Sequence, residues 1–319
     1  MVGRRTRVVF LGNDEWSVPS LEAIAASEHE LALVITRVPR PAGRGNRLTP
    51  TPVAIAARRL GLPLKEVETV KSGHGLEALR GARPDVIAVV AYGEIVPAEV
   101  LRIPSVGPVN LHFSLLPELR GAAPVQRAIL EGLTATGVTT MLMDEGMDTG
   151  PILEQAEEQI EEEDDAGSLG HRLSAVGARL LVDTIDRLAA NQLEPRPQDH
   201  AKATYAPKLR PEERWIDWMQ EAGVIVRRVR ALAPEPAAST LFRGKTLKVF
   251  GGVADPSTGR EPGAITDVSK DGFGVGAGEG IVRILELAPE GRKRMTAAEF
   301  VRGYRPDVGE RLGSSDGST

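Results

Sequence analysis

The chain has 319 residues, 41% of them hydrophobic and 26% charged, which is the composition of a globular protein long enough for two domains. A net charge of -5 excludes a uniformly basic surface, so any contact with RNA must use local basic patches. The absence of cysteine excludes disulfides, thiolate metal sites and a cysteine nucleophile. No apolar run is long enough to span a bilayer and no signal-peptide core follows the basic start, so we expect a cytoplasmic protein.

The first half alternates predicted strands and helices. Arg7–Leu11 is a short apolar run that ends at Gly12, which is typical of a buried parallel strand. Further strands are predicted over 31–35, 86–91 and 106–112, and helices over 17–26, 52–60, 76–80 and 168–190. This order predicts an α/β fold with a doubly wound, Rossmann-like parallel sheet. Ligands of such sheets bind beyond the carboxyl ends of the strands, which places Tyr92, Gly93 and Ile95 to help line a pocket.

The segment from Arg37 to Pro52 concentrates positive charge. It contains four arginines, which are punctuated by prolines and glycines: Arg37, Arg40, Arg44 and Arg47. Such a composition predicts a mobile segment without regular structure. Taken alone, it is most simply a solvated surface loop.

Two polar residues interrupt the apolar strand 106–112. Asn110 and His112 are two positions apart, so their side chains project from the same face of an extended strand. Asp148, in a loop bounded by Gly146 and Gly150, is a candidate partner, because a carboxylate favours the charged form of an imidazole. Such a trio could stabilise an oxyanion and move protons. By spacing alone, it is more often a set of satisfied polar residues than a catalytic site.

Other motifs give weaker signals. The first turn lacks the glycine pattern of dinucleotide-binding folds, and no Walker loop, nucleophile elbow or zinc-protease helix is present. The glycine-rich run Gly272–Gly280 is predicted to form hairpin turns between short strands. The remaining histidines lack the spacing of metal ligands, so no metal site is predicted: His29, His74, His171 and His200.

The last third predicts a second domain. A stretch rich in proline and polar residues, 191–211, has the composition of an extended connector, and a helix is predicted over 224–231. Closely spaced short strands then predict a small OB-like β-barrel. Basic residues recur there, among them Arg243, Lys245 and Lys248, and they are either scattered surface charge or a positive face for an RNA backbone. The tail 313–319 is predicted to be disordered.

Two motifs carry a resemblance to a known family. NLHFSLLPELRGAAPVQRAI and GVTTMLMDEGMDTGPIL resemble the signature of the formyltransferases that use 10-formyltetrahydrofolate, above all the members that act on methionyl-tRNA. The family's Asn, His and Asp fall on Asn110, His112 and Asp148. Its folate-contacting SLLP falls on Ser114, Leu115, Leu116 and Pro117. The resemblance implies that Asn110 and His112 stabilise the oxyanion, while Asp148 supports His112 and handles the amine proton.

The chain departs from the family pattern at two places. Phe113 stands where many members have glycine, and Asn13–Trp16 differs from the usual sequence. On a strand, Phe113 would point away from the face of His112, so we expect altered packing with the chemistry retained.

The resemblance extends to the basic regions. PRPAGRGNRL resembles the loop that enters the acceptor arm of the initiator tRNA, which implies tRNA contacts for Arg40, Arg44 and Arg47. The family's OB-like tRNA-binding domain implies the same for Arg243, Lys245 and Lys248. The expected organisation is a catalytic domain over 1–190, a linker over 191–211, a tRNA-binding domain over 212–312 and a tail.

The expected substrates follow from the same resemblance. They are methionyl initiator tRNA and 10-formyltetrahydrofolate, without metal, DNA or membrane, and the chain is expected to act as a monomer. Two alternatives remain open: a formyltransferase for a small amine, and an RNA-binding module that has lost catalysis.

Overall fold

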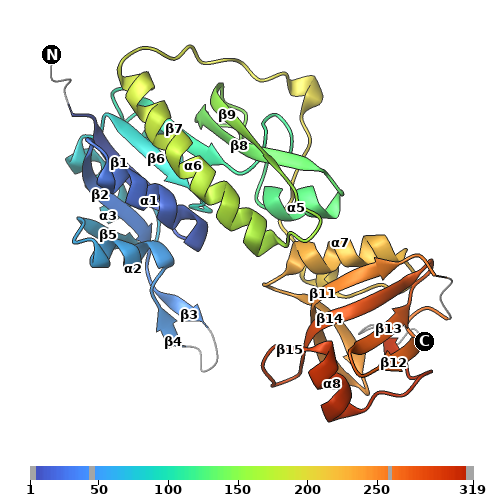
Figure 1. Cartoon of the computed structure of the whole chain (residues 1–319). Helices are drawn as coiled ribbons and strands as arrows, with labels where there is room; N and C mark the ends of the chain where they lie inside the picture. The colour runs from blue at the N-terminus through green and yellow to red at the C-terminus, as the bar shows by residue number, and fades with distance from the viewer. Residues whose placement is uncertain (1–4, 43–46, 258–260, 314–319) are drawn as a thin grey trace. The chain divides into compact units, whose positions relative to one another are not determined.

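The computed structural model describes residues 5–42, 47–257 and 261–313. The chain divides into two compact units, and each is described by itself (Figure 1). Unit 1 comprises 1–124, 135–159 and 170–207. Unit 2 comprises 125–134, 160–169 and 208–319. Within the described ranges, no helix is long and apolar enough to cross a membrane.

Unit 1 is built on a seven-stranded sheet. In spatial order its strands are β5 (Leu64–Val67), β2 (Glu30–Arg37), β1 (Arg7–Gly12), β6 (Val86–Val90), β7 (Gly107–His112), β8 (Ala135–Leu142) and β9 (Ile152–Gln159). Pairing is parallel from β5 to β7, whereas β8 and β9 add antiparallel strands at one side. The predicted Rossmann-like sheet is confirmed, and the antiparallel extension is a feature that the sequence analysis did not predict.

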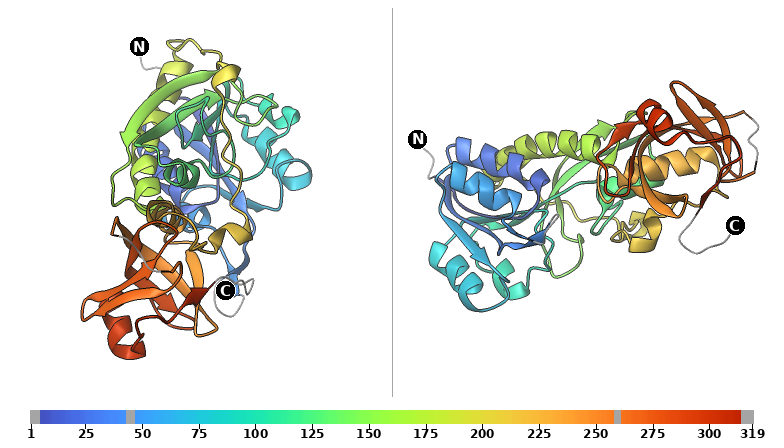
Figure 2. Two further views of the ribbon diagram at one scale, coloured as in Figure 1. Left: turned by 90° about the vertical axis from the view of Figure 1, so that its right-hand side faces the viewer. Right: turned by 90° about the horizontal axis from the view of Figure 1, so that it is seen from below.

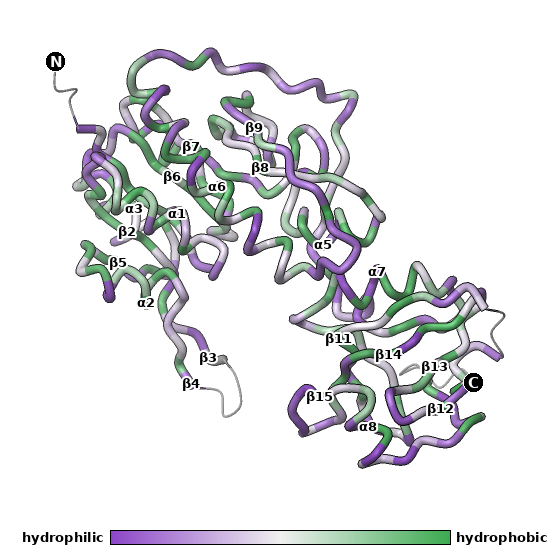
Figure 3. The backbone as a smooth tube through the Cα atoms, viewed as in Figure 1, coloured by the Kyte–Doolittle hydropathy of each residue, from purple (hydrophilic) through white to green (hydrophobic). Residues whose placement is uncertain are grey.

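Helices cover both faces of this sheet. They are α1 (Val18–Ala26), α2 (Pro52–Arg59), α3 (Gly73–Ala82), α4 (Ala98–Leu101) and α6 (Ala166–Ala189), whereas α5 (Pro124–Leu130) belongs to unit 2 from its second residue on. The helices α1, α2 and α6 lie on one face, and α3 and α4 lie on the other (Figure 2). The central strands are hydrophobic along their length because helices bury them from both sides (Figure 3).

Local sequence explains where α2 begins. Thr51 is extended, and its hydroxyl accepts a hydrogen bond from the backbone amide of Ala54 at 3.0 Å. Pro52 occupies the first helical position, where its missing N–H leaves no intrahelical bond unmade. The helix predicted over 52–60 is therefore confirmed almost to the residue.

The arginine-rich segment is more ordered than its composition predicts. Its two halves form an antiparallel hairpin of β3 (Arg40–Ala42) and β4 (Arg47–Thr49), so the prediction of a segment without regular structure is wrong. Backbone pairing needs only three residues on each side here, and Pro41 is tolerated because this two-stranded sheet consists of edges. The connecting residues 43–46, including Arg44, lie outside the described residues.

Unit 2 contains a curled antiparallel sheet. In spatial order it consists of β12 (Ile265–Ser269), β13 (Gly272–Gly276), β14 (Ile281–Pro289), β11 (Lys245–Asp255), β10 (Ala238–Phe242) and β16 (Leu312–Gly313), with β15 (Met295–Thr296) paired to β14. Two helices, α7 (Ala222–Leu232) and α8 (Ala297–Tyr304), contribute to one hydrophobic core with it. The predicted second domain, a small barrel-like β structure, is confirmed.

Three details of unit 2 differ from the sequence predictions. Gly272–Gly276, predicted as hairpin turn, is strand β13, and only 277–280 form a turn. Gly313 belongs to β16, so it is not part of a disordered tail, and 314–319 lie outside the described residues. Helix α8 was not predicted, although Thr296 and Glu299 form the reciprocal capping pair that marks its start.

Candidate active site

The predicted polar pair lies near the end of β7. Asn110 pairs with Val89 of β6 and Met141 of β8, and His112 pairs with Thr139 of β8. Both side chains are largely buried, with 9% and 6% of their residue surfaces exposed. The strand therefore presents an amide and an imidazole side by side from the middle of the sheet.

His112 is held through one ring nitrogen. Its Nε2 lies 2.9 Å from the carbonyl oxygen of Leu119, and since a carbonyl only accepts, Nε2 carries the hydrogen. The other nitrogen, Nδ1, lies 3.7 Å from Oδ2 of Asp148. This separation allows an ion pair with a protonated ring but is too long for a direct hydrogen bond. Nδ1 is thus the nitrogen left for a substrate atom.

Asp148 is fixed by a shaped loop. Its Oδ2 accepts a hydrogen bond from the backbone amide of Gly121 at 2.8 Å. Its backbone has a φ of 54°, in the left-handed region that non-glycine residues adopt rarely and aspartate more readily than most. A side chain at Gly150 would place its Cβ 1.8 Å from the carbonyl oxygen of Leu142, so only glycine fits there.

The preceding residues close the same loop. Oδ1 of Asp144 accepts hydrogen bonds from the amide of Gly146 at 3.0 Å and the hydroxyl of Thr149 at 2.7 Å. An aspartate that binds the backbone two residues ahead is a local turn-former. The loop's conformation is therefore encoded in its own sequence.

The amide of Asn110 remains available. Within the part of the chain that the structure describes, its side chain makes no hydrogen bond. An amide that has no partner within the protein can donate a hydrogen bond to the oxygen of a bound molecule. The structure therefore places Asn110 and His112 on one face of β7 with Asp148 beside the ring, and among the described residues the amide and Nδ1 have no hydrogen-bond partner.

The SLLP segment follows β7 and is anchored to β8 and β9. The hydroxyl of Ser114 donates to the carbonyl oxygen of Glu118 at 2.6 Å, and the amide of Leu116 donates to Oγ1 of Thr139 at 3.1 Å. Gln155 donates to the carbonyl oxygen of Leu116 at 2.9 Å. Ser114 and Leu116 are buried, whereas Leu115 and Pro117 are half-buried. The segment is a rigid wall beside His112.

The residues after β6 leave the sheet at the same edge, but their side chains differ in placement. Tyr92 is 2% exposed and packs in the core, so its side chain is not available to a ligand as the sequence analysis expected. Burial, together with the neighbouring carboxylate of Glu94, raises the pKa of Tyr92. The carbonyl oxygen of Gly93 accepts from Nη2 of Arg37 at 2.5 Å, and Ile95 is 78% exposed. Arg37 thus supports this loop.

The two departures from the family pattern meet in space. The rings of Trp16 and Phe113 lie 5.9 Å apart, centroid to centroid, with a tilt of 48°. Gly170 of α6 makes room for them, because a Cβ there would lie 2.2 Å from the ring of Trp16. The altered packing expected at Phe113 therefore involves the other departure as its partner.

Two further residues near the site were missed. Arg120 and Gln198 are 2% and 7% exposed, and they hydrogen-bond to each other. Gln198 lies in the stretch interpreted as a connector, where no periodicity or composition marks one glutamine as buried. Sequence reasoning had no signal for it.

The predicted tRNA-binding residues divide into two groups. Arg40 and Arg47 of the hairpin, and Lys245 and Lys248 of β11, are exposed. Arg243 instead forms a double hydrogen bond with Glu310, at 2.7 and 2.8 Å, and also donates to the carbonyl oxygens of Tyr304 and Arg305. Arg243 is exposed as well, but these donors are engaged within unit 2, and its contact with tRNA stays a prediction.

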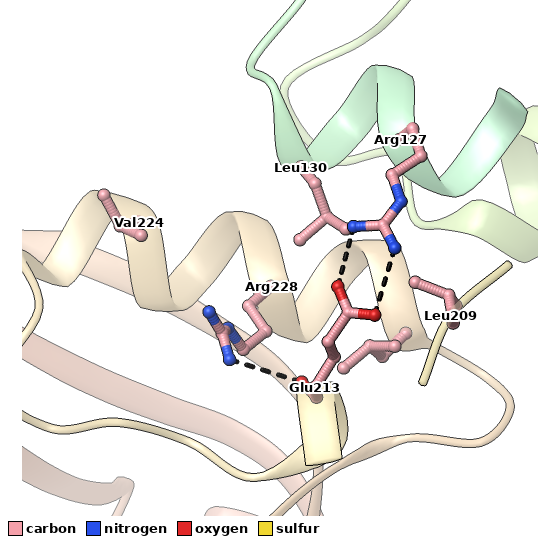
Figure 4. Close-up of a pocket in the computed structure, with 7 residues that line it drawn as sticks. Arg127, Leu130, Leu209, Glu213, Val224 and Arg228 are labelled. Atoms are coloured by element: carbon pink, nitrogen blue, oxygen red, sulfur yellow. Dashed lines mark hydrogen bonds and ion pairs between the residues drawn. The ribbon is translucent and has the colours of Figure 1, made fainter. Parts of the chain in front are cut away.

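Unit 2 also has a pocket of about 230 Å³ (Figure 4). Two of the residues that line it form an ion pair: Arg127 donates to both carboxylate oxygens of Glu213, at 2.7 and 3.0 Å. This pairing lowers the pKa of Glu213 to about 2. The pocket contains none of the predicted site residues. Among the residues described, no group of three His, Asp or Glu side chains is placed to hold a metal ion.

Two family models and several curated relatives match most of this chain. A family described as formyl transferase matches residues 6–185, and the formyl transferase C-terminal domain matches 208–305. The methionyl-tRNA formyltransferase of Moorella thermoacetica is 45% identical over 96% of this chain and 99% of its own length. That of Magnetococcus marinus is 42% identical over 96% and 98%.

Solved structures show the same fold at lower identity. HypX from Aquifex aeolicus, in complex with tetrahydrofolic acid, has a TM-score of 0.67 and 19% identity, over 96% of this chain and 49% of that one. The sugar 3N-formyl transferase WlaRD has a TM-score of 0.64 and 16% identity, over 91% and 100%.

Proposed function

The chain belongs to the methionyl-tRNA formyltransferase family, and we propose that Asn110, His112 and Asp148 carry its chemistry. The reaction transfers the formyl group of 10-formyltetrahydrofolate to the amino group of methionyl-tRNA. The observation that carries the assignment of residues is that the Asn110 amide and Nδ1 of His112 have no hydrogen-bond partner among the described residues, while the carboxylate of Asp148 lies 3.7 Å from that nitrogen.

The proposed steps follow from this arrangement. The methionyl amine attacks the formyl carbon, and the carbonyl oxygen becomes an oxyanion that accepts hydrogen bonds from Asn110 and Nδ1 of protonated His112. Asp148 takes the proton that the amine loses. The bond from carbon to N10 of the folate then breaks, and the proton reaches that nitrogen as tetrahydrofolate leaves. Because Nε2 is fixed by Leu119, the ring cannot turn away during these steps.

The substrates are positioned by the surrounding segments in this proposal. Ser114, Leu115, Leu116 and Pro117 form the wall against which the folate lies, with the backbone at Gly93 and the exposed side chain of Ile95 opposite. Arg40, Arg44 and Arg47 contact the acceptor arm of the initiator tRNA, and Lys245 and Lys248 contact its backbone. Arginine suits this role because its planar fork matches phosphate and stacks on unpaired bases.

The remaining expectations are part of the same proposal. The catalytic domain extends over 1–190 and the linker over 191–211, and the tRNA-binding domain extends over 212–312. The protein acts as a monomer in the cytoplasm.

Loss of either titratable member of the trio tests the chemistry. His112→Ala or Asp148→Asn is expected to lower kcat by about 10²–10⁴-fold while folding and tRNA affinity stay nearly unchanged. Turnover is measured as transfer of labelled formyl to charged tRNA. His74→Ala, whose side chain is 89% exposed, is the matched control and should behave as wild type. Near-normal turnover of either site variant would contradict the assignment.

The acceptor is tested in the same assay. Label should pass to methionyl initiator tRNA and not to free methionine, amino sugars or glycinamide ribonucleotide. Transfer to small amines alone would contradict the tRNA assignment, and no transfer to any acceptor would favour a binding module without catalysis.

A further inference from the structure

The side chain of Gln198 forms hydrogen bonds to the backbone of the Asp148 loop. Its Nε2 donates to the carbonyl oxygen of Asp148 at 2.9 Å and to that of Gly150 at 2.7 Å. One side-chain amide thus binds the carbonyl of the proposed catalytic residue itself and that of the glycine two positions later. With 7% of its surface exposed, Gln198 makes these bonds in a place where water competes little.

Arg120 fixes the orientation of this amide. Its Nε and Nη2 donate to Oε1 of Gln198 at 3.1 and 2.6 Å, and Nη2 also lies 3.2 Å from Nδ1 of His200. A guanidinium can only donate, so the amide oxygen must face Arg120 and the nitrogen must face the loop carbonyls. For the same reason Nδ1 of His200 is the unprotonated nitrogen. The orientation is therefore determined by chemistry on both sides.

The burial of Arg120 needs an explanation. It is 2% exposed, and no carboxylate pairs with it among the described residues. A buried charge is costly unless it is fully hydrogen-bonded. We therefore ask which groups the donors of Arg120 bind. Within the ranges that the structure describes, the side chains it binds are those of Gln198 and His200.

The backbone joins this network to the carboxylate. The amide of Arg120 donates to Thr204 and its carbonyl accepts from Ala206, which ties the 198–206 stretch to it. The next residue, Gly121, donates its amide to Oδ2 of Asp148. Asp148 is thus held at its backbone by Gln198 and at its carboxylate by Gly121, on either side of Arg120. The two contacts together fix a residue whose φ of 54° lies in the left-handed region.

We infer that Gln198, oriented by Arg120, is a positioning residue that sets the direction in which Asp148 presents its carboxylate to His112. This inference rests on the proposed role of Asp148. The 191–207 stretch then has two roles. It connects α6 to the later part of the chain, and it supplies the side chain that positions Asp148.

The variant Gln198→Glu tests the inference. It keeps an oxygen for Arg120 but replaces the two N–H donors with an oxygen that faces two carbonyl oxygens. We expect kcat to fall about 10- to 100-fold, the usual effect of losing a group that orients a reacting side chain. KM for 10-formyltetrahydrofolate and for methionyl-tRNA should stay within about twofold, because neither substrate touches Gln198. The control Gln192→Glu makes the same charge change at an exposed position of the same stretch and should leave kcat unchanged.

A second background separates this role from a general structural one. In an Asp148→Asn protein, whose residual turnover is followed with labelled formyl over a single turnover, Gln198→Glu should cost less than about threefold. An equal loss in both backgrounds would overturn the inference, as would a wild-type kcat for Gln198→Glu. Near-normal turnover of Asp148→Asn alone would instead contradict the proposed function. If circular dichroism shows Gln198→Glu to be unfolded, Gln198→Met, which removes the donors without adding charge, is judged by the same criteria.

Discussion

The guanidinium groups of the hairpin and those of unit 2 differ in what they bind. Arg40 and Arg47 of the hairpin are exposed, and within the described ranges neither has a carboxylate partner. In unit 2, Arg243 binds Glu310, Arg283 binds both Asp255 and Asp267, and Arg127 binds Glu213. The two described arginines of the hairpin thus lack an ion-pair partner among the described residues, whereas these three arginines of unit 2 are ion-paired.

This difference separates the number of charges from their availability. An arginine with a bidentate carboxylate partner has its donors occupied and its charge neutralised, so binding a phosphate means breaking the pair first. An exposed arginine without such a partner exchanges only water and counterions. Among the described residues, Arg40 and Arg47 therefore keep their donors free for the RNA contact proposed above, whereas Arg127, Arg243 and Arg283 have donors engaged within unit 2.

Removal of both described hairpin arginines should have the largest effect. Arg40→Ala with Arg47→Ala is expected to lower kcat/KM for methionyl-tRNA about tenfold or more at 0.15 M salt, and to reduce the slope of its logarithm against log salt by about 1 to 2. KM for 10-formyltetrahydrofolate should not change. Steady-state kinetics across a salt series measure all three quantities.

A paired arginine serves as the control for the hairpin variant. Arg58, in α2 of the same unit, forms an ion pair with Glu66. Arg58→Ala should therefore leave the salt dependence of kcat/KM for methionyl-tRNA unchanged. If the hairpin variant instead impairs folate binding, the hairpin serves the other substrate. An unchanged kcat/KM would show that free charge at this position is not used.

The fold was largely predictable because its signals are local. The buried runs of β1 and β6, and the cap and proline at the start of α2, each show in a few adjacent residues. The hairpin was missed because its order comes from backbone pairing, which leaves no hydrophobic pattern in a segment of arginine, proline and glycine. The antiparallel strand β9 was missed for a related reason, since its outer residues alternate with little apolar content.

The site was predictable only in part. Asn110 and His112 share a strand face by simple alternation, and glycines mark the Asp148 loop. Arg120 and Gln198 are 78 positions apart, and only the folded chain places them together. Likewise, nothing in the sequence pairs Arg243 with Glu310, so the resemblance to the family assigned it to tRNA without a sign of this ion pair.

The next contrast lies within unit 2. Arg243→Ala should lower the melting temperature, because it leaves Glu310 and the carbonyl oxygens of Tyr304 and Arg305 without their donor. Its effect on tRNA affinity at fixed salt should be small. The double variant Lys245→Ala with Lys248→Ala should show the reverse, an affinity lower by a few-fold with an unchanged melting temperature. Differential scanning fluorimetry and filter binding compare the two, and a tRNA defect confined to Arg243→Ala would reverse the distinction.

The smallest expected effect concerns the pH at which the Arg127–Glu213 ion pair stops contributing to the stability of the fold. Arg127 lowers the pKa of Glu213 to about 2, from an ordinary value of 4.5. A carboxylate with a depressed folded-state pKa stabilises the fold fully above its unfolded pKa, and that contribution disappears as the pH falls from about 4.5 towards 2. Since the pair is partly in contact with water, we expect about 1 kcal/mol.

Unfolding of wild type and Glu213→Gln by urea at pH 6 and at pH 3 measures that contribution. The difference in the free energy of unfolding should be largest at pH 6 and shrink at pH 3, as protons begin to compete with Arg127 for the carboxylate. Arg40→Ala should show no such pH-dependent difference from wild type. Among the described residues, no carboxylate pairs with the guanidinium of Arg40, so its loss changes no carboxylate pKa. If Arg40→Ala instead changed the stability with pH as Glu213→Gln does, Arg40 would have to be paired with a carboxylate. The distinction between the unpaired arginines of the hairpin and the paired arginines of unit 2 would then be wrong.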